Sequence, residues 1–239
     1  AYVRVVDANG NVVIKQDDRG HNAYDFGIPS NDYGLNRPFM STANPLAANQ
    51  YDVLENGGDQ LNATFTADVN ITSFLKANVT STVNWGQTNY SNYSNPFYGS
   101  KVGVNGEINK QSTSALRTNN VQTLTYFQDF DRHSVNVMVG HEYYKTTTKF
   151  LGAIAQGGFS PSIPEIDAFA KISDASSYKS GYNVEGYFGS AQYNYDQRYF
   201  ASASFRRDAS SYFAKENRWG NFWSVGGAWL ISKENFMQS

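Results

Sequence analysis

Cysteine is absent from this chain of 239 residues, and proline and histidine are scarce, with 6 and 3 copies. The absence of cysteine excludes disulfide bonds, thiolate metal sites and cysteine nucleophiles. No segment approaches the ~20 consecutive apolar residues that a membrane-spanning helix needs. The formal net charge of −2 includes no basic stripe of the kind that nucleic-acid-binding domains carry. We therefore expect neither helical membrane spans nor a nucleic-acid partner.

Catalytic and metal-binding motifs are also missing. The sequence has no G-x-S-x-G elbow, P-loop or H-E-x-x-H helix. His133 and His141 share one parity, but eight residues of extended chain separate them by about 26 Å, so they cannot share a metal ion. Asp7, Asn9 and Asn11 resemble the start of a calcium loop, yet Val12 stands where that loop requires glycine. We expect a turn there, and no metal, cofactor or catalytic residue in the chain.

Aromatic residues are plentiful instead, with 17 tyrosines, 16 phenylalanines and 4 tryptophans, and such usage favours strands. The clearest strand signal is Leu61–Ile71, where apolar and polar residues alternate at every position. Its length matches the ~9–11 residues of a tilted membrane strand. Six further strands are predicted at Phe74–Trp85, Leu116–Phe130, Ser134–Thr146, Val184–Tyr195, Arg198–Arg207 and Asn221–Ile231.

The connections between these predicted strands alternate in length. Thr72-Ser73, Asp129–Arg132 and Asp196-Gln197 are short turns, whereas Gly86–Ser114 and Thr147–Asn183 are long segments expected to be loops. Outer-membrane barrels show this alternation, because their periplasmic turns are short and their extracellular loops are long. The fold class predicted is all-β: a segment of about seven antiparallel transmembrane strands from a larger barrel, with long extracellular loops.

The domain organisation follows from the same reading. Residues 1–60 are expected to form an extracellular loop region with a small hairpin over Val3–Lys15, turning at Asn9-Gly10, and a polar stretch that runs to about Asn49. Residues 61–239 are expected to form the barrel segment. Seven strands would leave two open edges, so we expect the chain not to be a complete folding unit.

Period two also predicts which side chains face lipid. The outward set is Leu61, Phe65, Val69, Leu75, Val79, Val135, Val137 and Tyr199. The inward set is Asn62, Thr66, Asp68, Lys76 and Arg206.

An aromatic segment beside the second strand is the candidate substrate-binding region. Its aromatic residues alternate with amides and hydroxyls, and aromatic faces with nearby amides can stack on and hydrogen-bond a sugar or a peptide. The alternative is that these rings pack the loop against itself. The candidate residues are Trp85, Tyr90, Tyr93, Phe97 and Tyr98.

Residues 187–239 carry a family resemblance. They read YFGSAQYNYDQRYFASASFRRDASSYFAKENRWGNFWSVGGAWLISKENFMQS. This string resembles the signature of the SusC/RagA family of TonB-linked outer-membrane transporters, with departures at Ser190, Ala209 and Trp223. A short second match is Asn44–Ala47, similar to the step before a barrel strand in that family. The family-motif residues, which we expect to be mainly structural, are Arg207, Asp208, Ser210, Ser211, Phe213, Asn217, Arg218, Trp219, Gly220 and Trp229.

The resemblance implies import of large nutrients, oligosaccharides or peptides, through a 22-stranded barrel. It implies three partners: a SusD-like surface lipoprotein, TonB and the lipid bilayer. The plug and the TonB box of such transporters cannot be placed on any residue here. Two alternatives stay open: a β-rich glycan-binding surface module without transport, and an enzyme barrel, which would need a nucleophile and a base on one lumen patch.

Overall fold

The computed structural model describes residues 2–18, 20–25, 44–97 and 99–237. A hairpin of β1 (Arg4–Val6) and β2 (Val12–Ile14) precedes the helix α1 (Pro45–Tyr51). Seven long strands follow: β3 (Val53–Asn70), β4 (Leu75–Ser94), β5 (Glu107–Phe130), β6 (His133–Gly158), β7 (Phe169–Tyr195), β8 (Tyr199–Ser210) and β9 (Trp219–Trp229). Short 3-10 helices are η1 (Val102–Val104), η2 (Ile166–Ala168), η3 (Lys215–Asn217), η4 (Ile231–Lys233) and η5 (Asn235–Met237).

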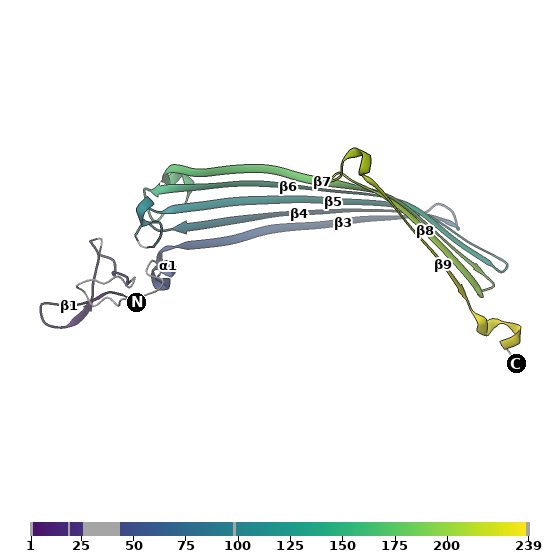
Figure 1. Cartoon of the computed structure of the whole chain (residues 1–239), viewed down its shortest axis with the longest axis horizontal. Coiled ribbons are helices and arrows are strands. Elements are labelled where there is room, and N and C mark those ends of the chain that lie inside the picture. The colour runs from purple at the N-terminus through teal and green to yellow at the C-terminus, as the bar shows by residue number, and fades with distance from the viewer. Residues whose placement is uncertain (1, 19, 26–43, 98, 238–239) are drawn as a thin grey trace. The chain divides into compact units, whose positions relative to one another are not determined.

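The seven long strands form one sheet in chain order, β3 to β9, and the pairs β7–β8 and β8–β9 are antiparallel (Figure 1). This agrees with the all-β meander predicted from the sequence. None of the helices in the described part of the chain is long and apolar enough to cross a membrane.

The structure divides into two compact units by its internal contacts. The first unit comprises Ala1–Gly58, Thr88–Thr113 and Phe150–Tyr178, and the second comprises Asp59–Gln87, Ser114–Lys149 and Lys179–Ser239. The second unit contains all the short turns and the whole of β8 and β9. It also contains nearly every residue whose facing was predicted from period two.

The short turns lie where the sequence predicted them. Asp196 and Gln197 have φ values of 55° and 49°, and the Arg198 amide donates to the Tyr195 carbonyl at 3.0 Å. Two consecutive residues with positive φ make a type I′ turn, the hairpin turn whose twist matches that of its strands. Asp131, with φ 54°, serves the turn between β5 and β6.

The predicted long loops are wrong in their extent. β4 continues to Ser94 and β5 begins at Glu107, so only residues 95–106 separate them. Likewise, only residues 159–168 lie between β6 and β7. The added strand residues are rich in Asn, Ser, Thr and Gln, and their side chains pair across strands, as Ser112 Oγ does with Asn89 Oδ1 at 2.9 Å. Where both faces of a strand are polar, or where both mix polar and apolar residues, the period-two signal is lost, so the predicted strands ended too early.

The strand lengths differ in a systematic way. β8 and β9 have 12 and 11 residues, close to the ~9–11 of a tilted membrane strand. β5, β6 and β7 have 24, 26 and 27 residues, more than twice that length. The extra length lies at the end of each strand away from the short turns.

The N-terminal hairpin is confirmed, but its connection is longer than two residues. Val6 pairs with Val12, so residues 7–11 form the loop. Asp7 Oδ1 accepts from the amides of Asn9 and Asn11 at 2.9 and 2.8 Å. The Asn11 amide is the main cause that lowers the pKa of the Asp7 carboxyl. The polar stretch expected to run to Asn49 lies partly outside the described residues, and its last residues belong to α1.

The short Asn44–Ala47 motif begins α1. Asn44 caps the helix, because its Oδ1 accepts from the Leu46 and Ala47 amides at 3.1 and 3.4 Å. Pro45 then occupies the first turn, where its missing N–H costs nothing. The motif therefore begins the short helix that leads into β3.

Candidate functional site

The seven-stranded sheet of the second unit has two chemically different faces. Cross-strand contacts identify the first, which we call the polar face: Thr64 lies 3.2 Å from Thr82, Thr66 lies 3.5 Å from Thr80, and Lys76 pairs with Asp68 at 2.9 Å. Because side chains alternate along a strand, Asn62 shares this face, while Leu61, Phe65, Val69, Leu75 and Val79 share the other.

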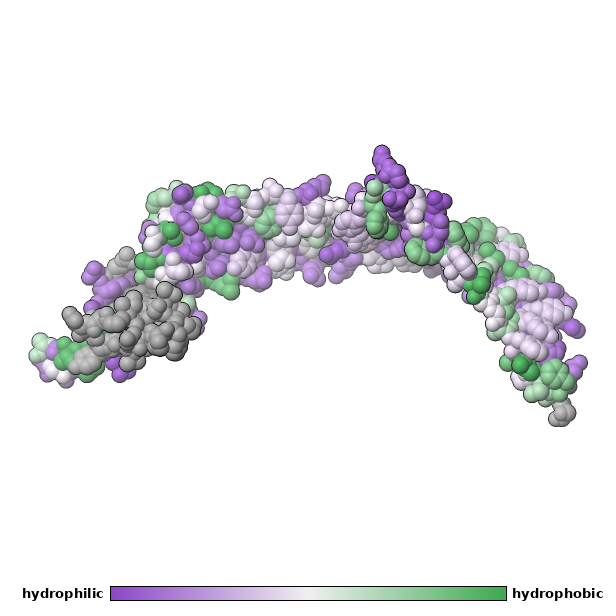
Figure 2. Space-filling view, viewed as in Figure 1, coloured by the Kyte–Doolittle hydropathy of each residue, from purple (hydrophilic) through white to green (hydrophobic). Residues whose placement is uncertain are grey.

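Strands β7 to β9 show the same division. On the face opposite Arg206, Tyr193 pairs with Ala201, and Ala203 pairs with Val225. We call this the apolar face. Its residues on these strands are Tyr187, Gly189, Ala191, Tyr193, Tyr195, Tyr199, Ala201, Ala203, Phe205, Trp219, Trp223, Val225, Gly227 and Trp229, together with Glu185, Arg207, Ala209 and Asn221. In Figure 2, apolar and weakly polar side chains cover the region of β8 and β9, whereas the β8–β9 loop carries hydrophilic ones.

Two aromatic rows bound this apolar face. Next to the short turns, the rings of Tyr195, Tyr199 and Trp229 stack in sequence, with centroids 6.3 Å apart at each step. At the other end, Tyr187 stacks on Trp219 at 6.1 Å, and the Arg207 guanidinium lies 4.9 Å over the Trp219 ring. Eight residues of β8 separate Tyr199 from Arg207, which is about 26 Å of strand, or roughly 20 Å of height at a strand tilt of about 40°. Outer-membrane barrels have an apolar band about 25 Å tall between two aromatic girdles.

The predicted facing residues are sorted as expected. On β6, His133 contacts Tyr193 and His141 contacts Glu185, so the odd-numbered residues between them, including Val135 and Val137, share the apolar face. Every residue of the predicted outward set lies on the apolar face. Every residue of the predicted inward set lies on the polar face.

The weak alternation of β5 has a structural cause. Asn120 and Gln122 lie on the apolar face, where hydrophobic residues were expected. Ser81 Oγ donates to Asn120 Oδ1 at 2.8 Å, and Gln122 Oε1 lies 2.9 Å from His141 Nδ1. Both amides sit level with the second aromatic row, at the edge of the apolar band, so their polar groups have partners.

A charged cluster occupies the polar face of β6 and β8. Arg206 Nη2 donates to Glu142 Oε2 at 2.7 Å, and Arg206 Nε donates to Asp208 Oδ1 at 2.8 Å. Asn119 Nδ2 donates to the other Glu142 oxygen at 3.2 Å. The Phe188 ring lies 5.2 Å from the guanidinium carbon. The cluster joins three strands through groups that can also bind polar ligands.

A tyrosine cluster lies farther from the short turns on the same unit. The rings of Tyr182 and Tyr144 are 5.7 Å apart, and the rings of Tyr182 and Tyr212 are 4.5 Å apart. Tyr212 is 73% exposed, so its ring is open to solvent. A group of neighbouring tyrosine rings can contact sugar rings or peptide groups.

The five aromatic residues predicted to bind substrate are not brought together. Trp85 lies on β4 in the second unit. Tyr93 is buried with Ile108, Ala155 and Phe169, and burial, followed by nearby Asp52, raises the pKa of its hydroxyl. Phe97 packs on Tyr51 with centroids 5.6 Å apart. Tyr98 lies outside the described residues.

Tyr90 lines a hollow that Trp85, Tyr93 and Phe97 do not line. This hollow of 770 Å³ lies in the first unit, against β3, β4, β5 and β6, and is lined by Asn56, Asn89, Lys110 and Ser112, among others. Lys110 Nζ pairs with Glu165 Oε2 at 2.5 Å at its rim. The aromatic segment was expected as one loop, but most of it is strand, and strand alternation sends its neighbours to different faces.

The family-motif residues make contacts within the chain. The Ser211 hydroxyl accepts from the Asn183 amide at 2.9 Å, which ties the β8–β9 loop to β7. Arg218 Nε donates to the Phe213 carbonyl at 2.9 Å and holds the base of that loop. Asp208 pairs with Arg206, and a Cβ added at Gly220 would meet the Phe222 ring at 3.2 Å. Asn217 lies in η3, where its amide donates to Ala214.

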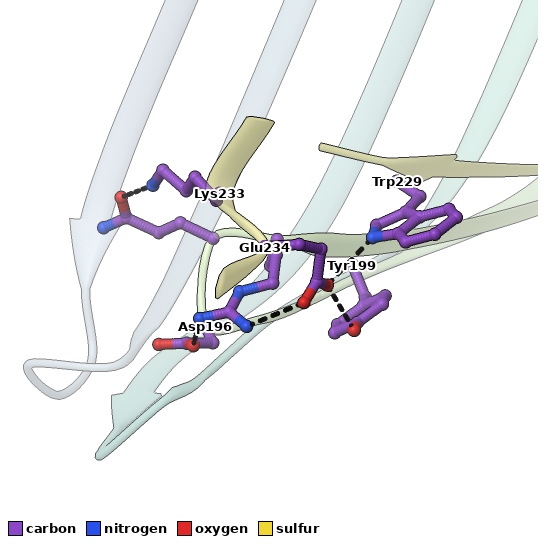
Figure 3. A network of polar contacts seen from close by, with 7 residues as sticks. Asp196, Tyr199, Trp229, Lys233 and Glu234 are labelled. Atoms are coloured by element: carbon purple, nitrogen blue, oxygen red, sulfur yellow. Dashed lines mark hydrogen bonds and ion pairs between the residues drawn. The ribbon is translucent and has the colours of Figure 1, made fainter. Parts of the chain in front are cut away.

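A polar network fastens the segment after β9 to the turn between β7 and β8 (Figure 3). Glu234 accepts from the Tyr199 hydroxyl at 2.6 Å, from Trp229 Nε1 at 3.0 Å and from Arg198 Nη1 at 3.2 Å. Arg198 Nη2 also pairs with Asp196 at 2.9 Å. The sequence analysis matched Trp229 and Glu234 to the family pattern, but nothing in the spacing predicted that one carboxylate would join them.

Comparison with known proteins agrees with this geometry. No protein-family model matches the chain. A TonB-dependent receptor of Formosa agariphila is 28% identical over 220 residues, which are 90% of this chain and 22% of that receptor. The TonB-dependent receptor SusC of Bacteroides thetaiotaomicron is 38% identical over 69 residues, 29% of this chain and 7% of SusC. The chain thus spans less than a quarter of the length of these curated relatives.

Two solved structures share the fold. The RagAB peptide transporter aligns with a TM-score of 0.75 and 24% identity, covering 92% of this chain and 24% of the matched chain. The RagAB peptide importer in its closed-closed state aligns with a TM-score of 0.76 and 22% identity, covering 93% and 24%.

The meander, its apolar band and these likenesses define a segment of an outer-membrane-type β-barrel. Within that class, the chain is similar to part of SusC-like TonB-dependent receptors. Its homologues are receptors and transporters, not enzymes. The enzyme barrel considered from the sequence is therefore set aside.

Proposed function

We propose that this chain forms part of the barrel wall of an outer-membrane importer that takes up large nutrients in a TonB-dependent manner. The observation that carries the proposal is the split between an apolar face, bounded by two aromatic rows, and a polar face with a charged cluster. Such a sheet is suited to lipid on one side and to a water-filled lumen on the other. The similarity to TonB-dependent receptors supports the transport role.

The long extensions of β4 to β7 on the side away from the short turns support one orientation of the barrel wall in the membrane. The short turns would face the periplasm, and the residues of β4 to β7 beyond the second aromatic row would project outside the cell. Residues 95–106 and 159–168 would then be extracellular connections. Residues 1–52 would form an extracellular region before β3, shorter than the 1–60 expected from the sequence because β3 already begins at Val53. A SusD-like lipoprotein on the cell surface would meet this extracellular part, and TonB would act through segments of the whole receptor that lie elsewhere.

The cargo proposed is an oligosaccharide or a peptide. Both classes present polar groups and flat surfaces that match tyrosine rings and amide side chains. Tyr144, Tyr182 and Tyr212 supply such rings in the second unit, and Tyr90, with its surrounding amides, supplies one in the first. Of the other residues predicted to bind substrate, Trp85 lies on the apolar face, which would meet lipid rather than cargo, while Tyr93 and Phe97 serve packing.

The test uses the whole receptor in its own cell. A strain that lacks the receptor should lose growth on one class of oligosaccharide or peptide, and the wild-type gene should restore it. Tyr182→Ala should slow uptake of that cargo about fivefold, because stacking is worth roughly 1 kcal/mol per ring, whereas Tyr182→Phe keeps the ring and should keep most of the uptake.

Two outcomes would contradict the proposal. Normal growth of the deletion strain on every oligosaccharide and peptide tested would remove the import role. A receptor that binds glycan at the cell surface but moves none across the membrane would favour the glycan-binding module considered from the sequence.

A further inference from the structure

Three lysines gather on the apolar face just beyond the second aromatic row. Lys145 and Lys149 of β6 and Lys179 of β7 line a hollow of 540 Å³ in the second unit. Trp85, Leu116 and Thr147 complete its centre, and none of the described residues that line it is acidic.

The lysines share a face with the lipid-facing band. On β6, Lys145 and Lys149 follow His141 at even spacing, so they continue the row of Val137, Val139 and His141. On β7, Lys179 stands at even spacing before Tyr187, which lies on the same face. The hollow is therefore continuous with the apolar surface rather than with the polar face.

Lys149 and Lys179 stand opposite each other. A Cβ added at Gly181 would lie 3.2 Å from the Thr147 Cα, so these two positions are paired across β6 and β7. In an antiparallel pair, the residues two places away, Lys179 and Lys149, then face each other on the same side. Like charges directly opposite destabilise a sheet unless something lies between them.

Three other lysines of the long strands and their connections are paired. Lys76 meets Asp68 at 2.9 Å, Lys101 meets Glu107 at 2.6 Å, and Lys110 meets Glu165 at 2.5 Å. Lys145, Lys149 and Lys179 have no ion-pair partner among the residues that the structure describes. Three lysine ammonium groups around one hollow repel one another, and a bound anion would remove that repulsion.

We propose that this hollow binds the phosphate-bearing headgroup of a glycolipid in the outer leaflet of the membrane. The inference rests on the proposed orientation of the barrel wall. The apolar band below would hold the acyl chains, the Trp85 indole would lie at the interface, and the lysines would hold the phosphates.

The height of the lysines above the second aromatic row indicates which kind of lipid could reach them. Lys145 and Lys149 lie four and eight residues beyond His141, about 13 and 26 Å along the strand. A strand tilt of about 40° reduces these to heights of roughly 10 and 20 Å. The headgroups of an ordinary bilayer add only about 5–8 Å on each side, so a phospholipid phosphate would lie too low. A glycolipid whose phosphates are carried on sugars reaches this height.

The experiment uses the full-length receptor in detergent and phosphorylated lipid A in mixed micelles as the probe. The triple variant Lys145→Gln, Lys149→Gln, Lys179→Gln should bind the probe at least about tenfold more weakly than wild type, because each lysine near a lipid headgroup contributes to the attraction. The matched control is Lys171→Gln with Lys215→Gln, two lysines that do not line the hollow, and it should bind as wild type does.

Two further probes separate the sources of phosphate. Dephosphorylated lipid A should bind to wild type about as weakly as phosphorylated lipid A binds to the triple variant, and inorganic phosphate alone should not compete. Equal binding of the triple variant and wild type would overturn the proposal, as would full competition by inorganic phosphate. If both proteins fractionate with the outer membrane while the lipid effect is absent, only this inference fails. If neither reaches that membrane, the proposed function fails as well.

Discussion

Arg206 donates to Glu142 at 2.7 Å although 64 positions separate the two residues in the chain. The bond crosses from β8 to β6 over β7 on the polar face, and Asp208 holds the same guanidinium from the other side. A contact that spans three strands makes their spacing depend on one side chain. It also leaves two carboxylates unbalanced if the arginine is removed.

The first prediction concerns this pair. Arg206→Gln should lower the free energy of unfolding of the whole receptor, because Glu142 and Asp208 would then repel each other without a cation. The coupling energy between Arg206→Gln and Glu142→Gln should be about 0.5–1 kcal/mol, since the side chains are 37% and 26% exposed and water screens them. Urea unfolding of wild type, both single variants and the double variant measures it. A coupling energy near zero would mean that the ion pair has no stabilising role.

The second prediction tests the two faces. Val137 lies midway along the apolar band, while its neighbour Asn136 lines a hollow on the polar face. Val137→Arg should destabilise the barrel by about 2–4 kcal/mol, as arginine does at a lipid-facing site near the membrane midplane. Asn136→Arg should cost much less, because its side chain would point into water. Folded receptor resists unfolding in cold detergent and migrates faster in gels, so the folded fraction of each variant can be read directly. Equal damage from the two substitutions would show that the faces are assigned wrongly.

The sequence predicted this part of the fold well, and the reason is physical. In the wall of a membrane barrel, one face of the sheet meets lipid and the other meets water, so apolar and polar residues alternate along each strand. That is why Leu61–Ile71 was recognised and why every predicted facing residue lies on the expected side. Turn-forming residues also predicted where the strands end, at Asp131 and Asp196, whose φ values are positive.

Beyond the apolar band, neither face of a strand meets lipid, so the alternation of apolar and polar residues is no longer required and is lost from the sequence. Residues 86–94 form strand with two polar faces, and residues 147–158 form strand with polar and apolar side chains on both faces, so neither segment alternates clearly and both were expected to be loops. The predicted substrate-binding residues were expected in one loop, but Trp85, Tyr90 and Tyr93 lie on β4, where strand geometry separates them. The Arg206–Glu142 pair could not be predicted without knowing that β6 and β8 lie on either side of β7 and in which register.

The third prediction concerns the orientation of the barrel wall. This chain contains no cysteine, so a single introduced cysteine is the only thiol that it contributes, and the receptor without the introduced cysteine gives the background. Cysteines at Ser100 and Ser162, both exposed in connections far from the short turns, should react with a membrane-impermeant thiol reagent on intact cells. A cysteine at Gln197, exposed in the β7–β8 turn, should react only after the outer membrane is opened. Labelling at Gln197 alone on intact cells would invert the orientation.

The fourth prediction concerns pH and the network around Glu234. The Tyr199 hydroxyl, then the Trp229 indole and Arg198, lower the pKa of the Glu234 carboxyl below its ordinary value. A carboxyl whose pKa is lower in the folded protein stabilises the fold above its unfolded pKa of about 4.3, and this contribution is lost as the pH falls through the folded pKa. Glu234→Gln should therefore lower the Tm of the receptor at pH 7, and the difference from wild type should shrink as the pH falls from about 5 to about 3. Glu216→Gln, in the β8–β9 loop, is the matched control and should leave Tm unchanged at both ends of that range. A Tm difference for Glu234→Gln that stays constant down to pH 3 would show that the ionised carboxylate is not what fastens the segment after β9 to the β7–β8 turn.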